Sequence, residues 1–148
     1  DILVEHIEKN RVMEKFVYWN VDGNTSGANI YQYIKRIKPS IEIRYFIHKG
    51  KSHGLDEFVE EICLDNSQLV IVPDAGTGDV DECAKIVGSG KDIIILDHHS
   101  ISDKGNPAIV VNNQLSEKVT DKAMTGVGIT YKFTKPPDRY YGVNYADE

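Results

Sequence analysis

Three aspartates and a pair of histidines are the residues of this chain whose types and spacing could do chemistry. Asp22, Asp74 and Asp97 each lie at or just beyond the end of an apolar run, and Asp97 continues directly into His98 and His99. If these runs are parallel strands, their carboxyl ends meet at one edge of a sheet, where ligands bind. Carboxylates gathered there repel one another, and a divalent cation relieves that repulsion. Mixed carboxylate and imidazole ligation favours Mn²⁺, with Mg²⁺, Co²⁺ or Zn²⁺ as competitors.

Each of these residues alone also has an ordinary structural explanation. An Asp-Gly pair such as Asp22-Gly23 is typical of a turn after a strand. Asp74 could be a loop residue, and Asp79 could cap the helix that follows it. The two histidines could lie in a loop without any ligand. The occurrence of all of them at three separate strand ends is what favours a metal site.

The elements that must position these residues alternate between short apolar runs and segments of helical periodicity. This alternation is typical of repeated βαβ units. Because the apolar runs lack a polar face, we predict an α/β fold with a parallel five-stranded sheet and helices on both faces, a Rossmann-like three-layer arrangement. The predicted strands are Phe16–Asn20, Ile41–Ile47, Leu69–Val72, Ile93–Leu96 and Ala108–Val111.

Apolar residues at spacings of three and four predict the helices. A first segment from Leu3 to Met13 could be helical, and a last helix is expected from Gly126 until Pro136 and Pro137 stop it. The eleven residues after Pro137 have no evident partner element. The three helices between the strands are indicated by Ile30, Ile34 and Ile37, by Leu55, Phe58, Val59 and Ile62, and by Val80, Cys83, Ala84 and Val87.

The composition limits the classes of function. Seventeen Lys and Arg against 23 Asp and Glu give a net charge of −6, which argues against binding duplex nucleic acid through a broad basic face. No apolar run is long enough to cross a membrane, and no signal peptide is evident at the start. Two cysteines, Cys63 and Cys83, cannot form a disulfide framework, so we expect a cytoplasmic protein.

Four blocks in order resemble the DHH phosphoesterase superfamily. They are Val-Asp-Gly-Asn-Thr-Ser-Gly at 21–27, Val-Pro-Asp at 72–74, Asp-His-His at 97–99 and Gly-Val-Gly at 126–128. Within it, the chain is most similar to the RecJ branch of exonucleases specific for single-stranded DNA. Supporting matches include His53-Gly54-Leu55 and Asn112. The resemblance implies a DHH-type domain over residues 1–148, a hydrolase, and a place in DNA repair and recombination.

The resemblance also implies a role for each matching residue. Asp22, Asp74 and His98 would be ligands of Mn²⁺ or Mg²⁺, with Asp74 bridging two ions. His99 would face the scissile phosphate, and Asp97 would be the buried carboxylate that orients its neighbours. The residues expected to meet phosphate or the nucleic-acid backbone are Thr25, Ser26, Gly126 and Gly128.

Two departures from the family pattern bear on activity. The first motif normally reads Asp-x-Asp-x-Asp-Gly, whereas this chain has Tyr18 and Asn20 at the first two acidic positions. Asn20 keeps a carbonyl oxygen but no charge, so it would be a weak metal ligand. The family's fourth acidic motif and its second, substrate-binding domain lie further downstream than Glu148. We therefore expect a domain truncated at its C-terminus, with little or no activity alone.

Three functional hypotheses remain open at this point. The first is metal-dependent hydrolysis of single-stranded DNA by a metal-activated water. The second is a phosphodiesterase of short oligonucleotides or cyclic dinucleotides. The third is a degenerate, non-catalytic scaffold that binds single strands or protein partners in DNA repair or replication, suggested by Tyr18 and Asn20. A cofactor-binding site for a dinucleotide is disfavoured, because Gly76-x-Gly78 lacks the third glycine.

Overall fold

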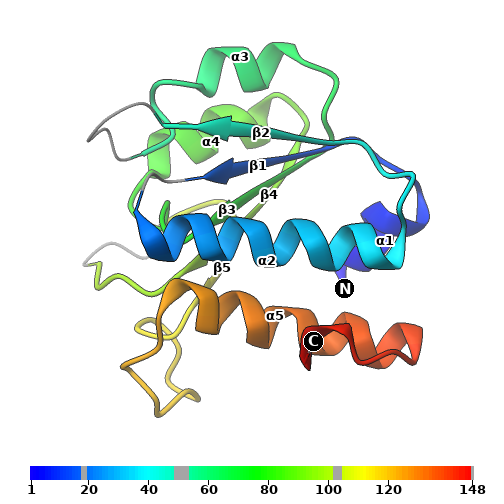
Figure 1. The fold of residues 1–148 in the computed structure, drawn as a ribbon. Coiled ribbons are helices and arrows are strands. Elements are labelled where there is room, and N and C mark those ends of the chain that lie inside the picture. Colours follow the sequence, from blue (N-terminus) through cyan, green and yellow to red (C-terminus); the bar gives the residue numbers. More distant parts are fainter. Residues whose placement is uncertain (18–19, 49–53, 102–104, 148) are drawn as a thin grey trace.

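A single parallel sheet organises the chain (Figure 1). The computed structural model describes residues 1–17, 20–48, 54–101 and 105–147, and the side chains of residues 14–17 are not described. Every neighbouring pair of strands is parallel, in the order β2-β1-β3-β4-β5. The strands are β1 (Met13–Val17), β2 (Ile43–Ile47), β3 (Leu69–Pro73), β4 (Asp92–Asp97) and β5 (Ile109–Asn112).

Helices cover both faces of this sheet, so the predicted α/β arrangement with a parallel sheet is confirmed (Figure 1). On one face lie α1 (Ile2–Glu8), α2 (Val21–Ile37) and α5 (Gly126–Tyr141), followed by a short 3₁₀ helix, η1 (Tyr145–Asp147). The other face is covered by α3 (Val59–Leu64) and α4 (Val80–Gly88). Leu55 and Phe58 precede α3, although the sequence pattern includes them in that helix.

The two central strands supply one residue to each face in turn. In β3, Leu69 and Ile71 pack on the side of α2 and α5, whereas Val70 and Val72 pack on the side of α3 and α4. All five residues of β3 are buried. A buried aliphatic side chain of this size contributes about 1.5–3 kcal/mol, so these strands form a rigid frame for the residues that follow them.

The first strand lies three residues earlier than the sequence pattern predicts, at Met13–Val17 rather than Phe16–Asn20. Asn20 caps α2 instead, and its side-chain oxygen accepts a hydrogen bond from the Gly23 amide at 2.6 Å. The segment predicted as helical to Met13 ends at Glu8 because Asn10 adopts a left-handed conformation, φ 52°. The chain therefore has room to enter β1 earlier.

The last helix does not stop at its two prolines, which corrects the prediction. Helix α5 continues through Pro136 and Pro137 and ends at Gly142, whose φ is 67°. Packing against α2 holds the helix on both sides of its prolines: the Tyr33 hydroxyl lies 3.0 Å from the Thr134 carbonyl and 2.9 Å from the Asp138 carboxylate, and these two acceptors share its one hydrogen. The residues after the prolines also have partners, since η1 packs on α5 and α2.

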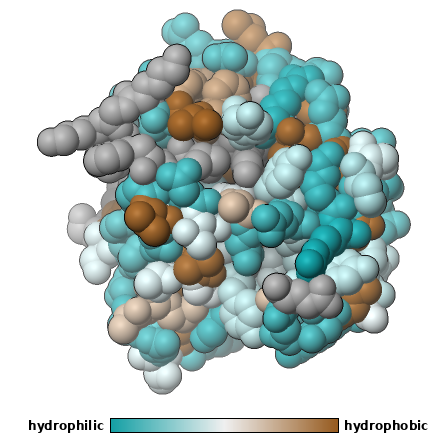
Figure 2. All heavy atoms as spheres, viewed as in Figure 1, coloured by the Kyte–Doolittle hydropathy of each residue, from teal (hydrophilic) through white to brown (hydrophobic). Residues whose placement is uncertain are grey.

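The order of the strands creates a crevice at one point of the carboxyl edge. From β1 the chain crosses to β2 on one side and later returns to β3 on the other side. The loops after β1 and β3 therefore diverge, and this is where open α/β sheets bind ligands. On the face formed by α2 and α5, apolar side chains lie in small groups among polar ones (Figure 2). No helix within the described residues is long and apolar enough to span a membrane.

Candidate metal centre

Asp74 lies directly after β3 and is a buried carboxylate of the crevice. Its backbone turns sharply there, with φ 67°, and its amide donates to the Leu96 carbonyl of β4 at 2.7 Å. This left-handed conformation is uncommon for a residue other than glycine and recurs at functional sites. The residue is 2% exposed, and its Oδ1 has no hydrogen-bond partner among the described residues.

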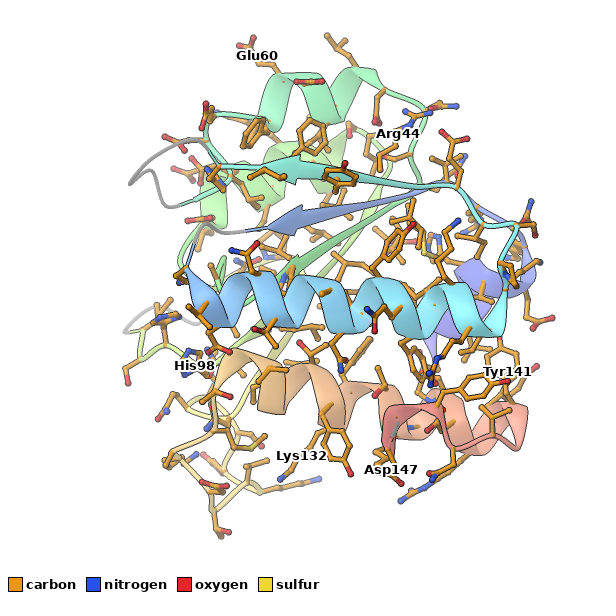
Figure 3. All side chains as sticks on the ribbon, viewed as in Figure 1. Arg44, Glu60, His98, Lys132, Tyr141 and Asp147 are labelled. Atoms are coloured by element: carbon orange, nitrogen blue, oxygen red, sulfur yellow. The ribbon has the colours of Figure 1, made fainter. Side chains whose placement is uncertain are left out.

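His98 and Asp22 approach this buried carboxylate from two other elements. The Nε2 of His98, just after β4, lies 3.1 Å from Asp74 Oδ1 and 3.6 Å from Asp22 Oδ2. Asp22 is the second residue of α2, which starts after β1. Figure 3 shows His98 beside the first turns of α2 and α5. The structure thus brings together three residues that span 76 positions of the sequence, from Asp22 to His98.

The Asp22 carboxylate is held by the first turn of α5. Its Oδ2 accepts a hydrogen bond from the Gly126 amide at 2.7 Å, and its Oδ1 accepts one from the Val127 amide at 3.0 Å. Amides at the start of a helix are natural partners of a negative charge. Gly128 lies two residues after Gly126 in α5, and its amide donates to the Thr125 hydroxyl at 3.3 Å.

The two carboxylates have opposite pKa shifts. Burial, followed by the negative charge of Asp22, raises the pKa of Asp74 to about 6. Burial also tends to raise the pKa of Asp22, but hydrogen bonds from the Val127 and Gly126 amides outweigh it and lower that pKa. A proton on Asp74 therefore relieves the repulsion when no cation is present.

Asp97 is the centre of a buried hydrogen-bond network that orients His99. Its Oδ1 accepts from His99 Nδ1 at 2.7 Å and from the amides of His98 and His99. Its Oδ2 accepts from the Thr77 hydroxyl at 2.7 Å, and Asn112 Nδ2 donates to that hydroxyl and to the His99 carbonyl. Burial tends to raise the pKa of Asp97, but the hydrogen bonds from Thr77 and His99 lower it. Asp97 is thus buried and bonded to His99, and its role in orienting the catalytic residues stays a prediction.

These donor atoms fit a divalent cation. Asp74 Oδ1 and His98 Nε2 are 3.1 Å apart, yet this Asp74 oxygen accepts no hydrogen bond from the described residues. Two ligands at right angles around an ion, each about 2.1 Å from it, are separated by about 3 Å. One ligand atom from each of Asp74, His98 and His99 lies within 4.8 Å of the others. A cation would therefore meet oxygen and nitrogen donors already close to ligand spacing.

The start of α2 carries Asn20, expected as a weak metal ligand, and Thr25 and Ser26, expected to bind phosphate. The Asn20 oxygen accepts from Gly23, while a hydrogen bond from the Asn20 side chain lowers the pKa of Asp74 against the effect of burial. The exposed Thr25 donates its hydroxyl to the Val21 carbonyl at 2.6 Å. Ser26 is fully buried, and its hydroxyl has no hydrogen-bond partner among the described residues. Tyr18 lies outside the described residues, as does His53.

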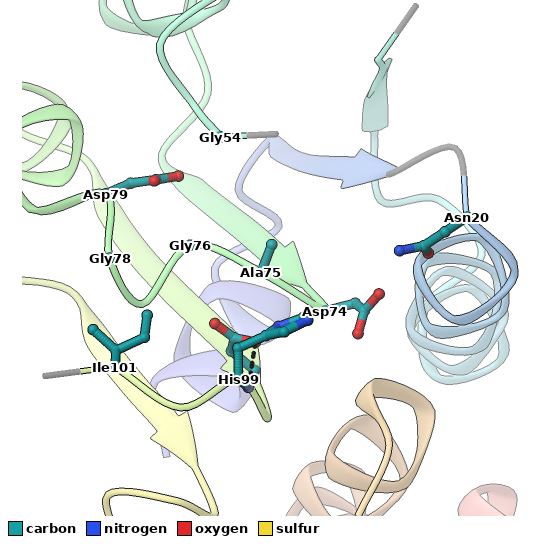
Figure 4. A pocket seen from close by; sticks show the side chains of 10 residues that line it. Asn20, Gly54, Asp74, Ala75, Gly76, Gly78, Asp79, His99 and Ile101 are labelled. Carbon is teal, nitrogen blue, oxygen red and sulfur yellow. Dashed lines mark hydrogen bonds and ion pairs between the residues drawn. The ribbon is translucent and has the colours of Figure 1, made fainter. Parts of the chain in front are cut away.

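A cavity of about 370 Å³ is lined in part by Asp74, Asp97 and His99 (Figure 4). Its far wall includes Asp79, which the sequence offered only as a helix cap, Gly54, which it offered only as a match to the family, and Ile101, to which it assigned no role. Asp79 stands at the start of α4 but makes no capping bond; it accepts from the Leu55 amide at 3.0 Å instead. Thr77 was likewise missed, although its position between Gly76 and Gly78, just beyond Asp74, was a usable signal.

Residues 17–147 match the family described as the DHH family, N-terminal domain. The chain belongs to this family. It is 39% identical over all 148 residues to the "Putative SPbeta prophage-derived single-strand DNA-specific exonuclease YorK" of Bacillus subtilis (strain 168). It has the same identity to the corresponding protein of Bacillus phage SPbeta. The chain spans 25% of the length of each of these relatives.

Solved structures share the fold of this DHH domain. The RecJ protein of Thermus thermophilus, in complex with Mn²⁺, has a TM-score of 0.83 at 22% identity, covering 99% of this chain and 22% of that chain. An exonuclease RecJ bound to manganese has a TM-score of 0.85 at 23% identity, covering 97% of this chain and 37% of that chain. The resemblance to the RecJ branch is thereby confirmed for this N-terminal domain.

Proposed function

We propose that this DHH domain takes part in metal-dependent hydrolysis of phosphodiester bonds, with Asp22, Asp74 and His98 holding Mn²⁺ or Mg²⁺. The observation that carries the proposal is the contact between Asp74 Oδ1 and His98 Nε2, 3.1 Å apart at the ends of two neighbouring strands. The membership in the DHH family supports the same class of reaction.

The chain's own residues would divide the work as follows. A bound cation would supply an activated water and neutralise the charge that develops on the phosphate. The Nδ1–H group of His99 donates a hydrogen bond to Asp97. This leaves Nε2 as the ring nitrogen that can contact a phosphoryl or leaving oxygen. His99 is the most exposed of these side chains, at 55%, so a substrate can reach it. Asp97 fixes the orientation of the ring through this bond.

Single-stranded DNA is the substrate class we propose. Its support is that both relatives are described as single-strand DNA-specific exonucleases. This chain covers a quarter of the length of each. Short oligonucleotides or cyclic dinucleotides would present the same phosphodiester to the same donor set. The net charge of −6 means that the cation, rather than a broad basic face, would attract the backbone at the centre.

A non-catalytic scaffold is the second candidate, and one observation favours it. The Asn20 oxygen is engaged by the Gly23 amide at 2.6 Å, so the position that is acidic in the family pattern offers this chain a capping group. Under this alternative the domain would bind single strands or replication partners without hydrolysing DNA.

Titration calorimetry with Mn²⁺, paired with a nuclease assay, tests the proposal. We expect saturable Mn²⁺ binding by the native chain and loss of most of that binding in Asp74→Asn. The matched control is Asp81→Asn, an exposed carboxylate of α4, which should bind as the native chain does. With Mn²⁺, any cleavage should favour single-stranded over duplex DNA and should disappear in His99→Ala. Absence of Mn²⁺ binding at millimolar concentration would refute the metal site.

Because little or no cleavage is expected of this chain alone, the scaffold would be favoured by Mn²⁺ binding without cleavage of any of the three substrate types by a longer protein of the family. The three types are single-stranded DNA, dinucleotides and cyclic dinucleotides. Because this chain covers a quarter of its relatives, the assay should include a longer protein of the same family that contains these residues. Cleavage by the longer protein that depends on the equivalents of Asp74 and His99 would support catalysis by this site.

A further inference from the structure

The first turn of α5 contacts both carboxylates of the candidate metal centre. The amides of Gly126 and Val127 each bind one oxygen of Asp22, at 2.7 and 3.0 Å. Two adjacent donors on one carboxylate fix its rotation as well as its position. Asp22 belongs to α2, so this pair of bonds also ties the start of α2 to the start of α5 across more than a hundred residues of sequence.

Gly126 also lies against Asp74 more closely than any other residue type could. A Cβ atom at this position would be 2.3 Å from Asp74 Oδ1 and 2.8 Å from Asp74 Cβ and Cγ. Asp74 cannot easily move away, because it is 2% exposed and its amide is bonded to Leu96. The requirement for glycine is therefore one of space, imposed by a side chain that follows β3.

Gly128 offers a natural comparison within the same motif. A Cβ atom there would be 3.6 Å from the Thr125 hydroxyl and 3.7 and 3.9 Å from Met124, which are ordinary contact distances. Its amide bonds Thr125 and contacts neither aspartate. The two glycines of Gly-Val-Gly thus differ: one touches the metal centre, and the other could be replaced without a clash.

We propose that the first turn of α5 is the positioning element of this metal centre, and that Gly126 is a positioning residue that sets the placement of Asp22 and Asp74 relative to each other. This inference rests on the proposed function, because it assigns the two aspartates to a common ion. It replaces the expectation that Gly126 provides close approach to the nucleic-acid backbone. The Gly126 amide already serves Asp22, and its missing side chain makes room for Asp74.

The experiment compares Gly126→Ala with Gly128→Ala in Mn²⁺ titrations, after circular dichroism has shown that both are folded. We expect Gly126→Ala to bind Mn²⁺ at least about tenfold more weakly, as is typical when partners of metal ligands are lost. Gly128→Ala should stay within about twofold of the native chain. Binding of single-stranded DNA without metal is measured as well, and Gly126→Ala should not change it.

A second variant keeps the inference testable if Gly126→Ala does not fold. Val127→Pro removes only the amide that binds Asp22 Oδ1, and proline is tolerated in the first turn of a helix. It should weaken Mn²⁺ binding in the same direction, by less than Gly126→Ala because the contact with Asp74 remains.

The outcomes separate this inference from the proposed function. Equal Mn²⁺ affinity in the native chain, Gly126→Ala and Val127→Pro would overturn the positioning role while leaving the metal centre intact. Weaker DNA binding in Gly126→Ala with unchanged Mn²⁺ affinity would restore the nucleic-acid role of Gly126. Absence of Mn²⁺ binding in the native chain would overturn the proposed function, and the positioning role with it.

Discussion

Asp22 and Asp74 carry the same chemical group, yet their surroundings prepare them for different tasks. Two helix-terminal amides hold Asp22 in its charged form, whereas burial and the neighbouring charge favour a proton on Asp74. A cation that binds between them must displace that proton. At the proposed metal centre, metal and proton would therefore compete for the same oxygen.

This competition predicts a pH dependence for metal binding. The pKa of Asp74 is raised to about 6, so Mn²⁺ affinity should rise by about tenfold per pH unit up to pH 6 from this carboxyl alone, and then level off. Without metal, the stability of the fold should change with pH in the opposite direction. The folded chain holds a proton that the unfolded chain releases near pH 4, so its stability should fall as pH rises from about 4 to about 6.

Calorimetric titrations at pH 5, 6 and 7, with denaturant unfolding of the metal-free chain at the same pH values, measure both effects. In Asp74→Asn the fall in stability should be reduced, since the titrating group is gone. A native affinity that is the same at pH 5 and pH 7 would contradict the assigned role of Asp74.

A substitution at position 20 should affect stability differently with and without Mn²⁺. In Asn20→Asp the new carboxylate can still cap α2. The substitution removes the side-chain amide that bonds Asp74 and places a second negative charge beside that residue. We expect a loss of about 1 kcal/mol without metal, roughly 3 °C in Tm, and recovery with Mn²⁺. Asn20→Ser, which keeps a capping oxygen and no charge, is the control. Equal destabilisation with and without Mn²⁺ would show that residue 20 does not face the ion.

Sequence reasoning placed the candidate ligands at one edge of the sheet because strand ends are readable from residue type. Asp22, Asp74 and His98 lie together at one edge of the sheet, as expected. The contacts of Gly126 could not be predicted, because they depend on how closely α5 approaches a strand end 52 residues earlier (126 − 74). A motif indicates that glycine is needed there, and only the packing shows which atom needs the space.

At the scale of elements, the loop after β3 is a structural part of the site. Thr77 is 1% exposed and joins Asp97 to Asn112, so the ends of β4 and β5 share one network. Because Asp97 is held by this network and bonds the His99 ring, the ring is fixed although the side chain is more than half exposed. Each buried polar group in the network depends on its neighbour for a partner.

Thr77→Val removes the hydroxyl while keeping the shape of the side chain. It should cost about 1–3 kcal/mol, because Asp97 and Asn112 lose a partner in a buried position. It should also change the ¹⁵N chemical shifts of the His99 ring, which report the tautomer. The control is Thr120→Val, an exposed position where the stability should change by less than about 0.5 kcal/mol. An unchanged His99 spectrum would mean that Thr77 does not help to orient the ring.

The boundaries of elements were less predictable than their existence. The first strand was predicted three residues too late because Tyr18 and Trp19 fit a strand by residue type, whereas Asn20 acts as a helix cap. In α5 a local rule was overridden by packing, since Tyr33 binds the helix beyond its first proline.

Pro136 provides a test of that override. It is exposed within α5, and Pro136→Ala would restore an amide that can donate to the carbonyl of Lys132. We expect this substitution to raise the free energy of unfolding by about 1–3 kcal/mol, measured by denaturant unfolding. Tyr33→Phe should act in the opposite direction by about 1–3 kcal/mol, because Asp138 loses a buried donor. A destabilising Pro136→Ala would mean that the proline shapes the helix in a way that packing requires.

At the scale of the whole molecule, strand order decides which residues meet. The βαβ pattern predicts a parallel sheet with helices on both faces, but it leaves open which strands are neighbours. The order β2-β1-β3-β4-β5 places the loops after β1 and β3 on either side of a crevice, with β4 beside them. Asp22, Asp74 and His98 converge for this reason, and the two hydrophobic layers keep the strand ends in register.

Anomalous diffraction from crystals of the chain grown with Mn²⁺ tests the central claim most directly, because it locates the ion without reference to activity. We predict a strong anomalous peak about 2.0–2.3 Å from Asp74 Oδ1 and His98 Nε2, with an Asp22 oxygen in the same coordination sphere. The peak should be absent in Asp74→Asn. A peak elsewhere on the surface, or none at the ends of β3 and β4, would contradict the metal centre.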